Sequence, residues 1–120
     1  MLRTLAIIFG LILAALGIIG FIPTYVTDGK LFNIFLVNLE GNVVHLASGI
    51  IAILCGLSSG FASKMFFIIF GVIYGFLAFL GFMQGHEGML FDMIAVNMAD
   101  NWLHAGIAAV SLLIGFGFKY

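Results

Sequence analysis

The chain has 120 residues, of which 64% are hydrophobic and 8% are charged. A soluble domain of this length leaves a substantial part of its surface in water, so this composition excludes an ordinary soluble protein and predicts a lipid bilayer as the partner. Four basic and five acidic residues give a formal net charge of −1, which is too little basic surface for a nucleic-acid-binding protein.

Four apolar segments are long enough to cross the hydrocarbon core as helices, because about 20 residues rising 1.5 Å each span roughly 30 Å. Pro23 is expected to end the first helix, since proline cannot continue the hydrogen-bond ladder. A short turn at residues 58–60 predicts that the second and third helices are antiparallel neighbours. We expect the helices near residues 2–22, 38–57, 63–83 and 97–118.

The second half of the chain repeats the first. Residues 28–56 match residues 87–115 at one constant spacing, and the match includes loop residues as well as apolar ones. The polar residues Asn42 and His45 recur in this way, as Asn101 and His104. Such matches do not follow from hydrophobicity alone, so we interpret them as a duplication.

The duplication predicts the architecture. Repeat 1 covers about residues 1–60 and repeat 2 about 61–120, and each contains two spans, so both enter the membrane from the same side. We expect one membrane domain over residues 1–120 with an all-α fold. It is a four-transmembrane-helix bundle made of two tandem helical hairpins in a parallel pseudo-twofold repeat.

The distribution of basic residues predicts the orientation in the membrane. Arg3, Lys64 and Lys119 fall on one side of the predicted spans, and Lys30 alone falls on the other. Basic residues favour the cytoplasmic side. We therefore expect both termini in the cytoplasm and the two longer loops outside.

Two asparagines stand where the second helix of each repeat begins. Asn38 and Asn97 are predicted to be N-caps, whose side chains accept hydrogen bonds from unpaired backbone N–H groups. Asp100, three residues after Asn97, is favourably placed at the positive end of the helix dipole. We interpret both caps as structural.

A polar stripe follows each cap. Asn42 and His45, and likewise Asn101 and His104, are spaced to share one face of their helix. Unpaired amides and imidazoles at this depth cost several kcal/mol, so we expect all four to face the bundle interior and to bond to one another or to a ligand. Asp100 lies four residues before His104 and is close enough to orient it or raise its affinity for a proton.

Three interpretations of this stripe stay open. The first is a closed hydrogen-bond network that holds the two hairpins in register. The second is a site for a small molecule, an ion or a proton near the outer face. The third is axial ligation of a haem or a chlorophyll-type pigment by His45, His104 or both, since two imidazoles on opposing helices can ligate one iron. A zinc site is not expected, because Asp100 is the one carboxylate at helical spacing.

The matched outer segments 31–37 and 90–96 are too apolar for ordinary loops and too short to span the membrane. We expect them to lie in the interface as short amphipathic turns that cover the polar stripe. His86 stands in an outer loop and has no counterpart in the first repeat, so we interpret it as solvated. Tyr74 is expected to contribute to core packing.

The paired Asn-x-x-His motifs, Asn-Trp-Leu-His at 101–104 and Ile-Phe-Gly-Val-Ile-Tyr-Gly at 69–75 resemble a family of small bacterial four-helix membrane proteins classed as a domain of unknown function. The resemblance covers essentially the whole chain. It implies a multi-pass protein of the bacterial inner membrane, and it implies no activity, substrate or cofactor.

The sequence offers little support for an enzyme, because no nucleophile stands at a plausible spacing from a base. We expect a non-enzymatic protein, either an accessory or assembly subunit of a larger membrane complex or a minimal carrier for a small solute, ion or proton. The first would have other membrane-protein subunits as partners, and the second would form a homo-oligomer.

Overall fold

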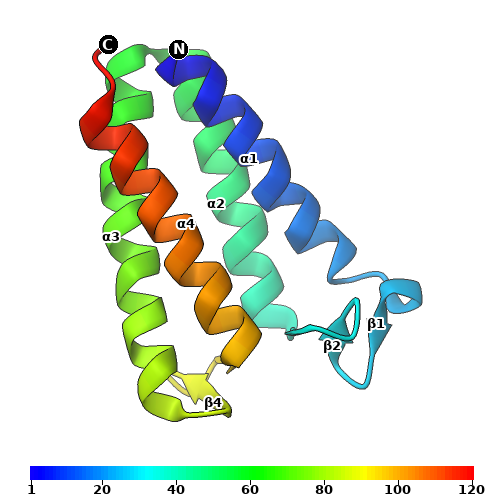
Figure 1. Ribbon diagram of the computed structural model, residues 1–120. Helices are drawn as coiled ribbons and strands as arrows, with labels where there is room; N and C mark the ends of the chain where they lie inside the picture. The colour runs from blue at the N-terminus through cyan, green and yellow to red at the C-terminus, as the bar shows by residue number, and fades with distance from the viewer.

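The computed structural model describes residues 1–120, and four long helices make up most of it. All four are long and apolar enough to cross a membrane. They form two antiparallel hairpins, and both termini lie at the same end of the bundle as the connection between the hairpins (Figure 1). We call this the terminal end and the opposite one the loop end. The helices are α1 (Leu2–Ile19), α2 (Leu39–Ser58), α3 (Gly60–Gln84) and α4 (Met98–Gly117).

Two helix ends differ from the prediction. α1 ends at Ile19, before Pro23, which instead opens the short 3-10 helix η1 (Pro23–Tyr25). Proline acts here through the residue that precedes it, because Ile22 is forced into an extended conformation (φ −93°, ψ 113°) that no helix contains. Between α2 and α3 only Ser59 is non-helical, and its Oγ accepts a hydrogen bond from Ala62 N at 3.0 Å to cap α3.

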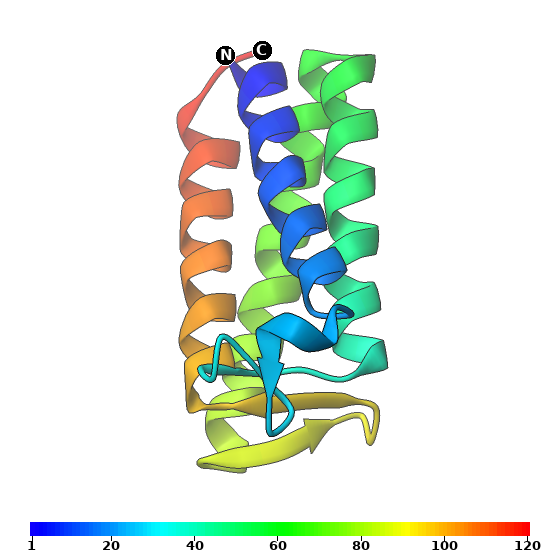
Figure 2. The ribbon, with the colours of Figure 1, turned by 90° about the vertical axis from the view of Figure 1, so that its right-hand side faces the viewer.

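The loop end contains strands, which the all-α prediction missed. β1 (Val26–Thr27), β2 (Lys30–Leu31) and β3 (Phe35–Leu36) form an antiparallel sheet between α1 and α2. β4 (Glu87–Leu90) and β5 (Ile94–Asn97) form a hairpin between α3 and α4. Both structures lie across the loop end of the four helices (Figure 2). The expected amphipathic turns are therefore β-hairpins, because pairing satisfies backbone groups that an unpaired turn would leave to water.

The β2–β3 and β4–β5 hairpins at the loop end, which we call the outer hairpins, turn in the same unusual way. Phe32 and Asn33 have φ values of 53° and 59°, and Phe91 and Asp92 have values of 54° and 59°. Two consecutive residues at positive φ define a type I′ turn, whose twist matches that of the flanking strands. Asparagine and aspartate tolerate this conformation, whereas phenylalanine rarely adopts it.

Small residues allow close contact within each helical hairpin. A β-carbon on Gly49 of α2 would lie 2.6 Å from the carbonyl oxygen of Gly10 in α1. In the second hairpin, a β-carbon on Gly71 of α3 would lie 2.8 Å from the side chain of Leu112 in α4. Close backbone approach of this kind stabilises helix pairs in lipid, where burial of apolar surface does not drive association. These glycines therefore mediate contacts between the helices of one bundle.

Between the two hairpins the space is filled by aromatic side chains. Towards the terminal end, Phe9 of α1 contacts Phe66 and Phe67 of α3 edge to face, with ring centroids 6.2 and 5.4 Å away. Phe66 and Phe67 are 2% and 0% exposed and pack with Ala6 and Ala52 into an apolar cluster. This phenylalanine cluster closes the terminal half of the bundle interior.

Two of the three basic residues at the terminal end, Arg3 and Lys64, cap helix C-termini. Arg3 donates from Nε to Gly56 O at 2.8 Å and from Nη2 to Leu57 O at 2.7 Å, both in the last turn of α2. Lys64 donates from Nζ to the carbonyl of Gly115 and to that of Phe118 at the end of α4. Cations are stabilised at helix C-termini, where carbonyl groups lack partners.

Candidate functional site

His45 of α2 and His104 of α4 meet between the two hairpins. Their ring centroids are 5.6 Å apart with an interplanar angle of 54°. The two residues are 8% and 3% exposed, so both imidazoles are buried. Helical periodicity placed each histidine on an inward face, and the tilt of the hairpins brings the two faces together.

Tyr74 of α3 completes this group. Its ring is stacked on His45, with centroids 6.2 Å apart and planes 3° apart, and lies 5.5 Å from the ring of His104. The Tyr74 hydroxyl donates to Ser48 Oγ at 3.0 Å. Tyr74 was expected to contribute to core packing, and Ser48 was not among the expected site residues. The signal for both was their depth in an apolar helix, where a hydroxyl needs a partner.

The histidines do not form the closed hydrogen-bond network that was one of the open interpretations. His45 Nε2 and His104 Nδ1 are buried and make no hydrogen bond to any protein group. Buried polar atoms are nearly always paired, and exceptions concentrate where a group has a functional role. The two ring nitrogens therefore have capacity for a ligand.

Asn42 and Asn101 do not join the histidines. The side-chain oxygen of Asn42 packs against Gly20 of α1, within the first hairpin. That of Asn101 packs against Gly81 of α3, within the second. Three residues along a helix turn the side chain by about 300°, so an asparagine and the histidine that follows it point some 60° apart. The polar stripe thus divides between two interfaces.

Asp100 and the two caps lie at the loop end of the helices. Asp100 Oδ2 accepts from Asn97 N at 3.0 Å while Asn97 Oδ1 accepts from Asp100 N at 2.9 Å, which is a capping box. Asn38 Oδ1 accepts from Gly41 N at 2.9 Å in the equivalent place on α2. Asp100 is 3% exposed and makes no hydrogen bond to His104.

A small cavity connects these groups. His45, His104 and Asp100 are its polar lining. It measures about 10 Å³ for the centre of a water-sized molecule, which is room for one water molecule. The remaining lining comes from the first turns of α2 and from the outer strands: Leu36, Val37, Gly41, Val44, Ile94 and Ala95.

The strands above the cavity are held together by exchanged hydrogen bonds. Asn38 Nδ2 donates to Met93 O at 2.7 Å, and Asn97 Nδ2 donates to Ile34 O at 2.9 Å. Each cap residue thus reaches from its own helix to the outer turn of the other half of the chain. We call these two hydrogen bonds the latch, because they fasten the outer hairpins over the cavity.

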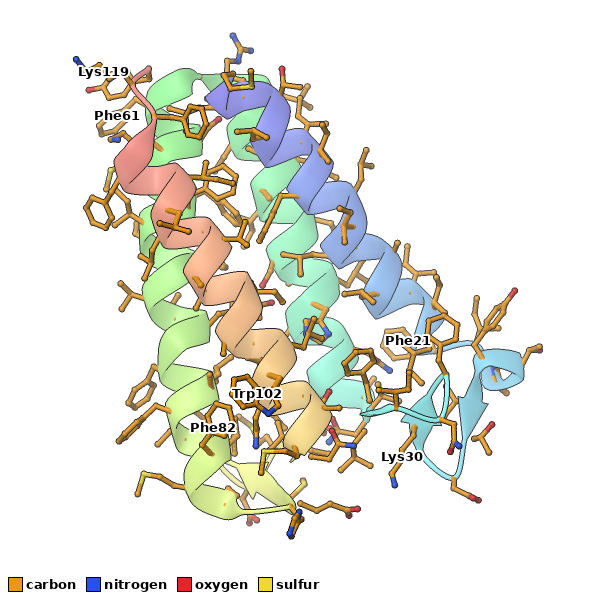
Figure 3. The ribbon with its side chains drawn as sticks, in the orientation of Figure 1. Phe21, Lys30, Phe61, Phe82, Trp102 and Lys119 are labelled. Atoms are coloured by element: carbon orange, nitrogen blue, oxygen red, sulfur yellow. The ribbon has the colours of Figure 1, made fainter.

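The remaining aromatic and histidine residues lie away from this site. Trp102 is 67% exposed and contacts Phe82 with ring centroids 5.0 Å apart, near the loop end on the outside of the bundle (Figure 3). Tyr25 is 46% exposed at the same end, and His86 is exposed in the turn before β4. An exposed tryptophan and tyrosine at one level suit the membrane interface.

The geometry separates the possible ligands. No three His, Cys, Asp or Glu side chains are placed to hold a metal ion. A haem or chlorophyll-type macrocycle does not fit between His45 and His104, because Tyr74 packs against both rings and the cavity beside them holds one water-sized molecule. The arrangement suits a small polar species that bonds to imidazole nitrogen and carboxylate oxygen.

Comparison with known proteins identifies a family and no function. No curated protein and no solved structure matches the chain. One family matches residues 3–117, which is nearly the full length, and its description is Domain of unknown function (DUF4383). The chain, with its four apolar helices, therefore belongs to the DUF4383 family of unknown function.

Proposed function

We propose that this membrane protein binds a small polar solute, an ion or a proton in the cavity beneath the latch. The observation that carries the proposal is the pair of buried ring nitrogens, His45 Nε2 and His104 Nδ1, that make no hydrogen bond within the protein. Ionisable side chains inside a membrane are costly to place and characteristically mark sites for ions, protons or substrates.

The position of the cavity supports binding from the loop end. Only short strands cover it on that side, and they are held by the two latch hydrogen bonds. On the other side the phenylalanine cluster fills the interior. A solute therefore has a shorter and more easily opened path from the loops than from the terminal end.

This proposal takes precedence over the accessory or assembly subunit. A purely structural cluster would gain most by pairing its own polar atoms, and the histidines do not do so. We further propose a non-enzymatic role, because the site combines two imidazoles and one carboxylate without a nucleophile beside them.

We also propose that the chain arose by duplication and that it lies in a bacterial inner membrane with both termini cytoplasmic. The exchanged latch bonds support duplication, since their donors and their acceptors each stand 59 positions apart.

The orientation is supported by Arg3 and Lys64 at the terminal end. Labelling of single cysteines at Ser59 and His86 with an impermeant maleimide, in a Cys55→Ala background, tests it: His86→Cys should react from outside the cell and Ser59→Cys should not.

Binding is tested by the thermal stability of the purified protein in mild detergent with a panel of small salts and polar solutes. A ligand present at 100 times its Kd should stabilise the folded state by about 2.7 kcal/mol. His104→Phe keeps a ring in the site but removes the nitrogens, so it should abolish the stabilisation. His86→Phe, in the exposed turn, should retain it. If every solute stabilises His104→Phe and His86→Phe to the same extent, the proposal is contradicted.

A further inference from the structure

We propose that the cavity takes a single water-sized cation that donates hydrogen bonds, ammonium, and holds it between the Asp100 carboxyl group and the rings of His45 and His104. This inference rests on the proposed function and adds to it the chemical class of the ligand. Four features of the site lead to it: its volume, its charge, its donor set and the burial of its polar groups.

The volume excludes all but the smallest solutes. The cavity has about 10 Å³ for the centre of a water-sized molecule, so one species of that size fits. Ammonium is close to water in size. A methylated ammonium, a carboxylic acid or a sugar would need the strands above the cavity to separate and stay apart.

The charge of the site favours a cation. Asp100 is the one acidic residue of the lining, and no lysine or arginine is among the lining residues. Lys30 lies beside Glu87, with Nζ and Oε2 4.0 Å apart. Lys119 stands at the opposite end of the bundle from Lys30 (Figure 3). A carboxyl group this deeply buried is stabilised in its charged form by a positive partner, because the surrounding dielectric is low.

The donor set favours hydrogen bonding over metal coordination. Alkali cations in proteins are held by several oxygen atoms that replace their hydration shell, and divalent cations need still more complete coordination. This site offers one carboxyl group, already engaged with Asn97 N, and two imidazole rings. Ammonium instead carries N–H groups that donate to imidazole nitrogen and carboxylate oxygen alike.

Both imidazoles are buried and belong to one site between the two hairpins. His45 and His104 come from different hairpins, are more than nine-tenths buried and line the same cavity. Each also has a buried ring nitrogen without a hydrogen-bond partner in the protein. The titratable groups of this region are these two histidines, Asp100 and Tyr74. α1 and the strands contribute apolar side chains to the core beside them, among them Phe9, Leu13 and Ile94.

The test is nitrogen NMR of the histidine rings in the full-length protein, in detergent at constant pH. Ammonium chloride should change the signals of His45 and His104 saturably and leave those of His86 unchanged. Potassium chloride and tetramethylammonium chloride at equal concentrations should have no effect. An equal response to potassium, or any response to the bulky tetramethylammonium ion, would overturn the inference.

The solute panel of the proposed function separates failure of this inference from failure of that function. If ammonium does not change the signals of His45 and His104 while another solute of the panel does, the ligand class is wrong and the proposed function survives. If no solute changes them, both fail.

A charge-removing variant gives a second, independent measurement. Asp100→Asn keeps an oxygen that can accept from Asn97 N but lacks the negative charge, so apparent ammonium affinity should fall by about tenfold or more. Asp92→Asn is the matched control, because Asp92 lies in an exposed outer turn whose counterpart already carries Asn33. Should Asp100→Asn fail to fold, His45→Phe tests the same loss. Unchanged affinity in a folded variant of either kind would contradict the site.

Discussion

The side-chain oxygen of Asn101 occupies the place where any residue other than glycine at position 81 would put its β-carbon. Gly20 and Asn42 stand in the same relationship in the first hairpin. Each asparagine is thereby fixed against the neighbouring helix of its own hairpin, and the histidine one turn further along is left to face the other hairpin. The glycines thus determine which polar residues reach the cavity.

Gly81→Ala is expected to destabilise the protein by about 1–3 kcal/mol, because the new methyl group collides with the Asn101 amide. Reversible unfolding in detergent measures the change. Gly106→Ala is the control, since nothing lies within 4 Å of that position, and it should be neutral or slightly stabilising. Adding Asn101→Ala should recover part of the loss in Gly81→Ala; strictly additive effects would contradict the contact.

Tyr74→Phe is expected to lower stability by about 0.6–1.5 kcal/mol, because it removes the hydroxyl that donates to Ser48 at 3.0 Å. A double-mutant cycle with Ser48→Ala isolates the hydrogen bond from other effects of each substitution. Tyr25→Phe, on an exposed tyrosine of η1, should change stability by less than about 0.5 kcal/mol. A cycle with no coupling energy would show that the two hydroxyls do not interact.

Removal of the latch should expose the histidines. Asn38→Ala and Asn97→Ala each delete a hydrogen bond between the outer hairpins together with a helix cap, and each should destabilise the protein by about 1–2 kcal/mol. Carbethoxylation of histidine, followed by mass spectrometry, measures access to the cavity. His45 and His104 should react several-fold faster in the double variant, while the exposed His86 reacts at its original rate. If each histidine reacts at the same rate in the original protein and in the double variant, the latch does not limit access to the cavity.

Arg3→Met is expected to loosen the last turn of α2. The substitution keeps an unbranched side chain but removes the donors to the carbonyls of Gly56 and Leu57. The predicted loss is about 0.5–1 kcal/mol, with faster amide hydrogen exchange at the end of α2 and no change in α4. Lys64→Met should show the reverse pattern, because Lys64 caps α4. Exchange that rises equally in both helices would indicate global destabilisation instead.

The sequence predicted the helices well because their signal is length and hydropathy, which do not depend on neighbours. The turns at residues 32–33 and 91–92 were not predicted in this way. Phe32 and Phe91 at positive φ run against the usual preference for glycine or asparagine, so no turn signal marks these two positions. Asp28-Gly29, which joins β1 to β2, is by contrast a recognisable hairpin turn in the sequence.

The candidate site was predicted in part. Depth and spacing were enough to bring His45 and His104 together in the interior, since both follow from helical periodicity. The departure of Asn42 and Asn101 from that group was not predictable, because it depends on which neighbouring helix has a glycine at the matching height. Ser48 and the cavity itself depend on how two hairpins pack, and no single segment contains that information.

The phenylalanine cluster around Phe66 and Phe67 has a consequence for traffic across the bilayer. Under the proposed function, these packed aromatic rings close the terminal end, so a solute that enters past the outer strands leaves by the same side. Vectorial movement would require the two hairpins to rock against each other, so that Phe9 parts from its partners on α3 while the loops remain shut. Under the proposed function, movement of a solute from one end of the bundle to the other is therefore limited by the packing of Phe9 against Phe66 and Phe67.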